Sequence, residues 1–336
     1  MREMKLDINP IINKVRATVE NHKLPEEGAY ARFRRVENGV SQLGELNEYG
    51  CADAANIRYT IGDMPTDETE RRACIEILQK FQNPQTGMFK EPTHVVMHGT
   101  AHCTAALELF DARPLYPMKE LEQYRSVERT LELLEELPWY ERPNSHTGAG
   151  LCSAMILTRM ATQEWKDAYF GWLDAHVDSE FGFGRAGFLY EKNSVPAWHH
   201  LNDWFHYLFN YHCARRAFPY AEKLVDSCIS LYREGRLRET FGQMKDFSEI
   251  DWVFALNRAS WQNGHRFAER TEVLTDFAEK YISYLNQVDT ETDACWNDIH
   301  LLFGMVCALS ELQLALPGVL ISEYPLRQVL DRRPFI

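Results

Sequence analysis

Residues 74–110 read CIEILQKFQNPQTGMFKEPTHVVMHGTAHCTAALELF, and this stretch decides the fold. Apolar residues recur at helical spacing up to about Gln82, and proline and glycine then mark a turn over residues 83–87. A second, more apolar helix is predicted over residues 98–110. The stretch therefore predicts a helical hairpin, in which a charged outer helix is followed by a turn and a buried inner helix.

The same hairpin recurs along the chain. Inner helices are predicted to begin at Tyr49, His98, His146, Trp198, Glu249 and Cys295. Successive starts are separated by 49, 48, 52, 51 and 46 residues. Outer helices are predicted over residues 7–22, 67–82, 118–137, 163–177, 220–233 and 267–287, and a loop or short hairpin over 23–48. A near-constant period of this length is typical of repeats built from helical hairpins.

Six hairpins in one uninterrupted series predict an all-α protein, a closed (α/α)6 toroid with a repeat of about 49 residues. We expect residues 1–336 to form a single toroid domain. The alternative is an open helical solenoid, whose terminal repeats normally carry a polar outer face. Neither end of this sequence resembles such a repeat, so the closed ring is favoured.

The composition excludes several classes of function. The net charge of -13 argues against nucleic acid and against an anionic membrane surface, because both recruit clustered Lys and Arg. The sequence has neither a run of about 18 apolar residues nor an evident signal peptide. The eight cysteines occur singly, mostly within apolar helical pattern, which indicates free thiols in a reducing compartment. We expect a cytoplasmic protein, and the oligomeric state is left open.

Part of the chain resembles known toroidal enzymes. Residues 74–89, CIEILQKFQNPQTGMF, are similar to the QW-type repeat of triterpene cyclases. Residues 98–110, HGTAHCTAALELF, resemble the following helix in protein prenyltransferase β-subunits. Both families are closed α/α toroids, so the resemblance implies that fold. The DxDD acid motif of the cyclases is absent, and Asp293, Cys295 and His300 match the residue types of the prenyltransferase zinc set but lie within one repeat.

The predicted architecture also resembles that of six-hairpin carbohydrate enzymes, namely glycoside hydrolases, polysaccharide lyases and N-acylglucosamine epimerases. Each predicted inner helix carries an ionisable or amide group in its first turns. Burying so many polar groups is costly unless a ligand or a partner satisfies them. This resemblance and this pattern favour a site where the inner helices begin.

Candidate site residues follow from their positions at these helix starts. Tyr49 and Asp53 share a helix face at spacing i, i+4, as do His98 and His102. His199, Asp203 and His206 also share a face, at spacing i, i+4, i+7. The candidate catalytic residues are Asp203, His199, Asp53, His98, His102 and Asp298. The candidate substrate-binding residues are Tyr49, His146, Trp198, Glu249, Asp251, Trp252, Trp296, Asn297 and His300.

One motif has the spacing of metal ligands. His98 and His102 have the spacing of two ligands on one helical turn, with Asp53, His146 or Asp203 as a third ligand. The HxxxH spacing is common by chance, so we expect no metal and no other cofactor.

The leading hypothesis is a carbohydrate-active enzyme, a hydrolase, lyase or epimerase, that acts on a small saccharide or uronate at the toroid mouth. Hydrolysis would use two carboxylates across the ring, whereas lyase or epimerase chemistry would use a His or Tyr base. The expected partner is a small-molecule or oligosaccharide substrate, with no nucleic acid and no membrane. Two alternatives are an isoprenoid-binding or cyclising enzyme and a non-catalytic helical scaffold.

Overall fold

The computed structural model describes residues 5–37, 40–139, 146–189, 195–333 and 335, and this part of the chain is predominantly helical. The prediction of an all-α protein is confirmed. The predicted inner helices are α2 (Glu48–Ile61), α4 (Val96–Leu109), α6 (Thr147–Leu157), α8 (Ala197–Cys213), α10 (Ser248–Asn263) and α12 (Ile299–Ala315). The predicted outer helices are α1 (Asn9–Asn21), α3 (Glu68–Lys80), α5 (Val127–Glu136), α7 (Gln163–His176), α9 (Ala221–Arg233) and α11 (Phe267–Gln287).

Two helices start more than two residues later than predicted, for local reasons. The helix predicted over 118–137 is divided into a 3₁₀ helix, η1 (Lys119–Arg125), and α5, because Ser126 caps α5 by accepting a hydrogen bond from the Arg129 amide at 3.3 Å. Helix α12 begins four residues after Cys295, since Asp298 acts as its N-cap and accepts from the His300 amide at 3.0 Å. Side-chain acceptors thus set the starts of both helices.

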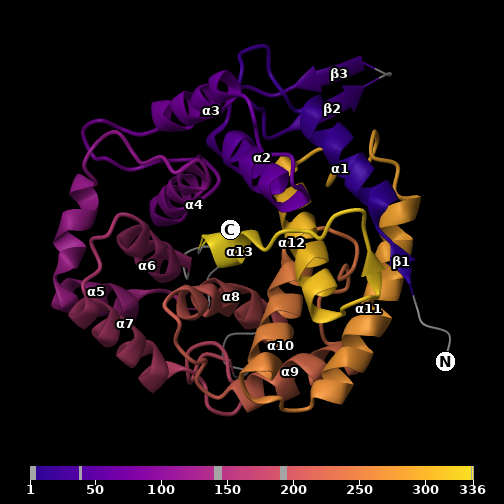
Figure 1. Cartoon of the computed structure of the whole chain (residues 1–336). Helices are drawn as coiled ribbons and strands as arrows, with labels where there is room; N and C mark the ends of the chain where they lie inside the picture. The colour runs from indigo at the N-terminus through magenta and orange to yellow at the C-terminus, as the bar shows by residue number, and fades with distance from the viewer. Residues whose placement is uncertain (1–4, 38–39, 140–145, 190–194, 334, 336) are drawn as a thin grey trace.

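The helices form two layers around a centre. Each inner helix contacts the next one in chain order, from α2 to α12, and α12 contacts α2. Figure 1 shows α3, α5, α7, α9 and α11 outside them. Helix α1 packs against α2, α11 and α12, so both ends of the series meet there.

The described strands are short and lie at the edge of the helical body. Strands β2 (Arg34–Glu37) and β3 (Val40–Leu43) form an antiparallel hairpin within the predicted loop region. Strands β1 (Leu6–Asp7) and β4 (Leu320–Ile321) pair in parallel and join the N-terminal and C-terminal segments.

Small residues let the inner helices approach one another closely. A Cβ added at Gly150 of α6 would lie only 2.8 Å from the backbone carbonyl carbon of Met97 in α4. In α2, Ala52 and Ala54 are fully buried. This close packing brings the first turns of neighbouring inner helices together.

A C-terminal segment fills the ring at the other end of the inner helices. Figure 1 shows helix α13 (Val329–Arg332) in the centre of the ring. Asp331 bonds to His212 of α8 at 2.8 Å and to Arg258 of α10 at 3.0 Å. Arg332 bonds to Glu108 of α4 at 3.1 Å. These bonds reach residues near the C-terminal ends of the inner helices, so the segment is anchored across this end.

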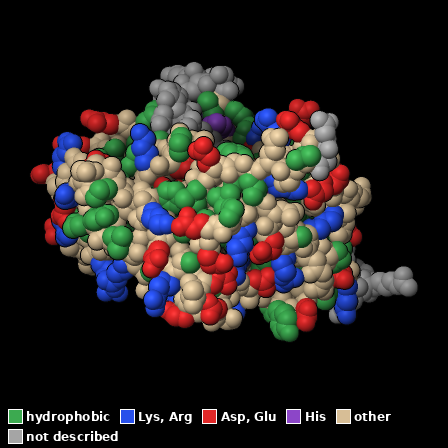
Figure 2. Space-filling view, turned by 90° about the horizontal axis from the view of Figure 1, so that it is seen from above, with side chains coloured by type: hydrophobic (Ala, Val, Ile, Leu, Met, Phe, Trp, Pro, Cys, Tyr) green, Lys and Arg blue, Asp and Glu red, His purple; other side chains and the backbone are tan. Residues whose placement is uncertain are grey.

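The outer surface carries charges of both signs. Figure 2 shows acidic and basic side chains interspersed over the face in view. None of the helices in the described ranges is long and apolar enough to cross a membrane.

Candidate functional site

Tyr49 lies among imidazoles at the centre of the ring. Its ring stacks on His94 and His102, with centroid distances of 4.3 and 4.6 Å, and meets the edge of His300 at 4.7 Å. Its hydroxyl lies 2.5 Å from Nδ1 of His98. Tyr49 is fully buried, and burial raises the pKa of its hydroxyl well above the ordinary value. The phenol is therefore protonated at neutral pH and shares a short hydrogen bond with an imidazole.

Asp53, one helical turn after Tyr49, is held between two histidines. Nε2 of His102 donates to one carboxylate oxygen at 2.8 Å, and Nδ1 of His300 donates to the other at 2.9 Å. Burial by itself would raise the pKa of Asp53, but the two imidazoles together lower it well below its usual range. Burial lowers the pKa of His102 to about 4, against the opposite effect of Asp53. At neutral pH the trio thus consists of a carboxylate that accepts from two imidazole N–H groups.

Three imidazoles, one of them that of His98, converge from three inner helices. His98 of α4, His146 at the start of α6 and His206 of α8 are buried, and each offers one ring nitrogen within 4.8 Å of the others. The rings of His146 and His206 stack with centroids 3.8 Å apart. Burial and the neighbouring His94, His206 and His146 lower the pKa of His98 well below the ordinary value, so it is neutral at pH 7. These three residues and the trio around Asp53 are the two groups that could hold a metal ion in the described ranges.

Asp203 of α8 lies beside this second group. It accepts from Nε2 of His146 at 3.0 Å and lies 3.8 Å from Nε2 of His199. The prediction placed Asp203 one turn from His199, and the structure adds His146 from the neighbouring helix. Asp203 therefore orients imidazoles from two helices.

The least buried imidazoles mark the accessible side of the site. The side chains of His94 and His199 are 17% and 24% exposed, whereas those of His102 and Asp53 are fully buried. Nδ1 of His94 bonds to Glu91 at 3.0 Å, which fixes the ring against Tyr49. The imidazoles are therefore more exposed toward the side of the ring where the inner helices begin.

The C-terminal segment forms the opposite wall of the site. The Phe335 ring meets the edge of His98 at 4.6 Å and packs 6.2 Å from His206. The Arg333 guanidinium is buried over the ring of Phe303, at 5.6 Å from its centroid. Burial lowers the pKa of Arg333 to about 10, and Nε and Nη2 have no hydrogen-bond partner among the described residues. A cation with unused donors therefore lies beside the imidazoles.

Several predicted site residues have other roles in the structure. Glu249 accepts from the amides of Gly242 and Met244 at 2.7 and 3.2 Å and so holds the loop before α10. Trp252 is buried and donates to the Cys228 carbonyl at 2.9 Å, which places it in the packing between α10 and α9.

The remaining predicted residues surround the start of α12 or lie on α8 and α10. Asp298 caps α12 and accepts from Arg32 at 3.1 Å. Asn297 donates to the Asp293 carbonyl at 2.8 Å. Trp296 and Asp251 are fully buried, and the half-buried Trp198 lies 5.9 Å from the Arg238 guanidinium. The structure thus brings Tyr49, Asp53 and Asp203 together with the predicted histidines, whereas the predicted Trp and Glu residues, Asn297, Asp251 and Asp298 have other contacts or are buried elsewhere.

The sequence prediction missed four residues of the centre: His94, His206, Arg333 and Phe335. His94 lies before α4, which begins at Val96, and before the predicted helix start at His98, so helical spacing did not include it. His206 was recognised on the face of Asp203 but was not assigned to the site. Arg333 and Phe335 carry no such signal, because only the path of the C-terminal segment brings them to the centre.

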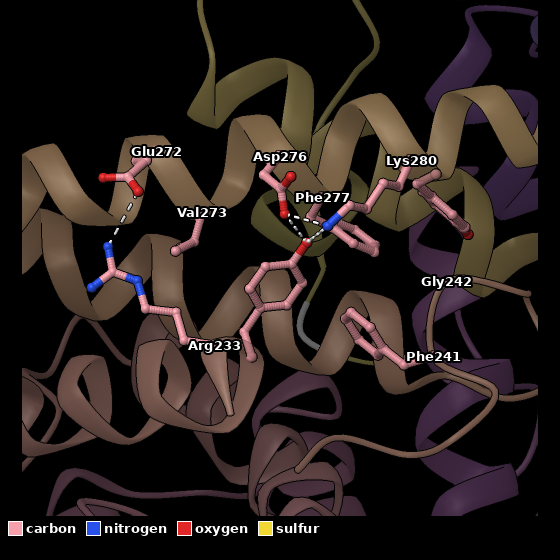
Figure 3. Close-up of a pocket in the computed structure, with 10 residues that line it drawn as sticks. Arg233, Phe241, Gly242, Glu272, Val273, Asp276, Phe277 and Lys280 are labelled. Atoms are coloured by element: carbon pink, nitrogen blue, oxygen red, sulfur yellow. Dashed lines mark hydrogen bonds and ion pairs between the residues drawn. The ribbon is translucent and has the colours of Figure 1, made fainter. Parts of the chain in front are cut away.

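A separate pocket lies on the outside of the ring, between α9 and α11. Figure 3 shows Asp276 and Lys280 facing one another, and they bond at 2.6 Å. The Tyr232 hydroxyl donates to the same carboxylate at 2.6 Å, and Arg233 pairs with Glu272 at 3.4 Å. Because these groups satisfy one another, the imidazole-rich centre is the better candidate site.

The centre thus combines a phenol, an ionised carboxylate and seven imidazoles: His94, His98, His102, His146, His199, His206 and His300. Such a set can exchange protons with a bound molecule and can hold a metal ion. Comparison with protein-family models, with curated proteins and with solved structures found no match to this chain.

Proposed function

We propose that the chain is a closed (α/α)6 toroid and acts as a carbohydrate-active enzyme, a lyase or epimerase, on a uronate or a related hydroxylated acid at its centre. The contact of α12 with α2 supports the closed ring. The hydrogen bond of 2.5 Å between the Tyr49 hydroxyl and His98 carries the functional proposal.

Proton transfer at a carbon next to a carboxylate suits this pair. A base removes the proton, and an acid either returns one to the other face, as in epimerisation, or protonates the departing oxygen, as in elimination. In elimination the electrons of the broken C–H bond form a C=C bond while the C–O bond to the leaving group breaks. Tyr49 passes its hydroxyl proton to Nδ1 of neutral His98 as its oxygen accepts the proton from the carbon. The other ring nitrogen of His98 then supplies a proton to the departing oxygen or to the other face of the carbon.

Arg333 supports an acidic substrate. Its Nε and Nη2 are buried donors without a described partner, and a guanidinium binds a carboxylate through two parallel hydrogen bonds. A substrate carboxylate at this position would satisfy both donors and stabilise the negative charge that develops when the adjacent carbon loses its proton.

The carboxyl groups favour this chemistry over hydrolysis. A glycosidase needs a protonated carboxyl with a raised pKa next to its carboxylate partner. Asp53 has a lowered pKa, and Glu249, whose pKa burial raises to about 7, is held by backbone amides. Asp53 therefore lacks the raised pKa of a glycosidase acid, and Glu249, which has it, already accepts hydrogen bonds from the amides of Gly242 and Met244.

The test is a screen of uronates and acidic oligosaccharides in D₂O. Elimination gives a product with a conjugated double bond that absorbs in the ultraviolet, and epimerisation incorporates deuterium at the carbon that loses its proton. Tyr49→Phe should lower the rate by about 10² to 10⁴. Tyr59→Phe, on the same helix but near its C-terminal end, is the matched control. Products of hydrolysis, or full activity in Tyr49→Phe, would contradict the proposal.

A non-catalytic helical scaffold is the second candidate. It is favoured by the pairing of Asp53 with His102 and His300 and by the C-terminal segment that fills one end of the ring. It predicts that no acidic saccharide changes the midpoint of thermal unfolding, even at saturating concentration.

A further inference from the structure

His98, His146 and His206 form a group that proton transfer does not fully explain. They come from α4, α6 and α8, and their side chains meet although the residues are far apart in the sequence. The ring centroid of His98 lies 5.8 Å from that of His146 and 5.5 Å from that of His206. Three imidazoles from three helices thus meet in one buried cluster.

Each of the three rings is oriented by an oxygen at one nitrogen. Nδ1 of His98 bonds to the Tyr49 hydroxyl at 2.5 Å, and Nε2 of His146 bonds to Asp203 at 3.0 Å. Nδ1 of His206 donates to the Asn202 carbonyl at 3.2 Å. Metal-binding histidines have this arrangement, because an oxygen partner fixes the tautomer and turns the opposite nitrogen toward the ion.

The surroundings of the group also suit a metal. Phe335 covers His98 and His206 on one side, and a hydrophobic wall limits the access of water to an ion.

The second group is less suited. Both oxygens of Asp53 already bond to His102 and His300, at 2.8 and 2.9 Å. A metal there would have to displace both hydrogen bonds. Asp53, His102 and His300 are better explained as a carboxylate with two imidazole partners.

We propose that His98, His146 and His206 bind one divalent transition-metal ion, with Zn²⁺ as the preferred ion. Zn²⁺ favours imidazole nitrogens at about 2.0–2.1 Å, which places tetrahedral ligand atoms about 3.3 Å apart. The three ring nitrogens lie within 4.8 Å of one another, so the rings need to move together by only about 1–2 Å to bind the ion. Three protein ligands leave a fourth position for water or substrate, as in catalytic rather than structural zinc sites.

These three ligands differ from the pair His98 and His102, which the sequence motif indicates. Helical spacing places His102 next to His98, but its Nε2 is bonded to Asp53. The site rests on side-chain geometry alone and stands independently of the proposed lyase or epimerase activity. With metal bound, Nδ1–H of His98 would donate to the Tyr49 hydroxyl oxygen.

The test uses the full chain, stripped with a chelator and titrated with ZnCl₂ by calorimetry. We expect one equivalent to bind, and we expect His206→Gln to weaken binding by more than about 100-fold, since loss of an orienting partner alone costs 10- to 100-fold. Asp203→Asn should fall in that smaller range. His212→Gln, on the same helix but bonded to Asp331, is the matched control and should bind normally.

X-ray absorption of the zinc-loaded wild-type protein gives a readout that does not depend on a variant folding. It should report three imidazole ligands. No stoichiometric binding, fewer than three imidazoles, or a loss of binding in His102→Gln but not in His206→Gln would overturn the assignment. None of these measurements uses a substrate, so they are separate from the test of catalysis.

Discussion

Asp53 shows how a buried charge is maintained at the centre of the protein. Its carboxylate is fully buried, which is costly for an isolated ion, but both oxygens accept hydrogen bonds from imidazoles. The bonds connect α2 with α4 on one side and α12 on the other. Asp53 therefore joins the first and last inner helices.

Asp53→Asn should destabilise the protein by about 3 kcal/mol, the usual cost of breaking a buried charged network. The amide nitrogen would face an imidazole N–H, which would lose its acceptor. Denaturant unfolding measures the change. Asp63→Asn, which breaks the exposed pair with Arg16, is the control and should cost less than about 1 kcal/mol. Equal effects in the two variants would refute the role assigned to Asp53.

His102 should make the protein sensitive to acid. Its pKa is about 4 in the folded protein and about 6.5 in the unfolded chain. Below pH 6.5 the unfolded chain takes up a proton that the folded protein does not, so stability falls with pH until about pH 4. Between pH 7 and pH 5 the expected loss is about 2 kcal/mol.

His102→Gln isolates this contribution, because glutamine can still donate to Asp53 but does not titrate. The free energy of unfolding should fall less steeply between pH 7 and pH 5 in the variant than in the wild type. Parallel pH dependence in the two proteins would show that His102 does not titrate as inferred.

Helical spacing predicted part of this site. The i, i+4 relation correctly placed Tyr49 with Asp53, and His98 with His102, on shared faces. It could not predict that His300 would meet Asp53, or that His206 would meet His98, because those contacts depend on which helices become neighbours. Nor could it exclude Trp252, whose helix position is near the rim but whose ring points to the outer layer.

The contact between α4 and α6 controls the spacing of the imidazoles. Gly150 lies against the backbone at Met97 and His98, so any side chain there would push the two helices apart. Gly150→Ala should destabilise the protein by about 1–3 kcal/mol, as overpacking does elsewhere.

Gly171 of α7 is the matched control, because a Cβ there would meet no atom within 4 Å. Gly171→Ala should be neutral or stabilising by up to about 1 kcal/mol, since alanine favours the helix. Thermal unfolding of both variants measures the contrast. A Gly150→Ala protein as stable as the Gly171→Ala protein would contradict the close approach.

Helix boundaries were predictable where the apolar period and the turn residues indicate the same start position. The starts of α2, α8 and α10 each lie one residue from the prediction. The division at Ser126 was missed because a single capping side chain overrides a continuous apolar pattern. The position of α13 was missed because four residues carry too little pattern to indicate what they pack against.

The whole chain should behave as one compact body if the ring is closed. A globular protein of 336 residues has a radius of gyration of about 20 Å. Small-angle scattering in solution measures this value directly. A clearly larger radius with an elongated profile would favour the open solenoid and contradict the closed ring.

The cysteines offer a second test of the whole molecule. All eight are free in the structure, seven of them buried and Cys213 half-buried. Denatured protein prepared without reductant should therefore yield eight thiols in a colorimetric titration. In the native protein Cys213 should react first but slowly, because burial raises its pKa to about 11. Missing thiols in the denatured chain would indicate disulfides.

The bond between His300 and Asp53 spans 247 residues, and this separation has a consequence for synthesis on the ribosome. At about 5–20 residues per second, roughly 12–50 s pass between the emergence of Asp53 and that of His300. During this interval α2 and α4 present a carboxylate and imidazoles that lack their final partners. The centre should therefore be the last part of the nascent chain to become resistant to protease, well after the first hairpins have formed.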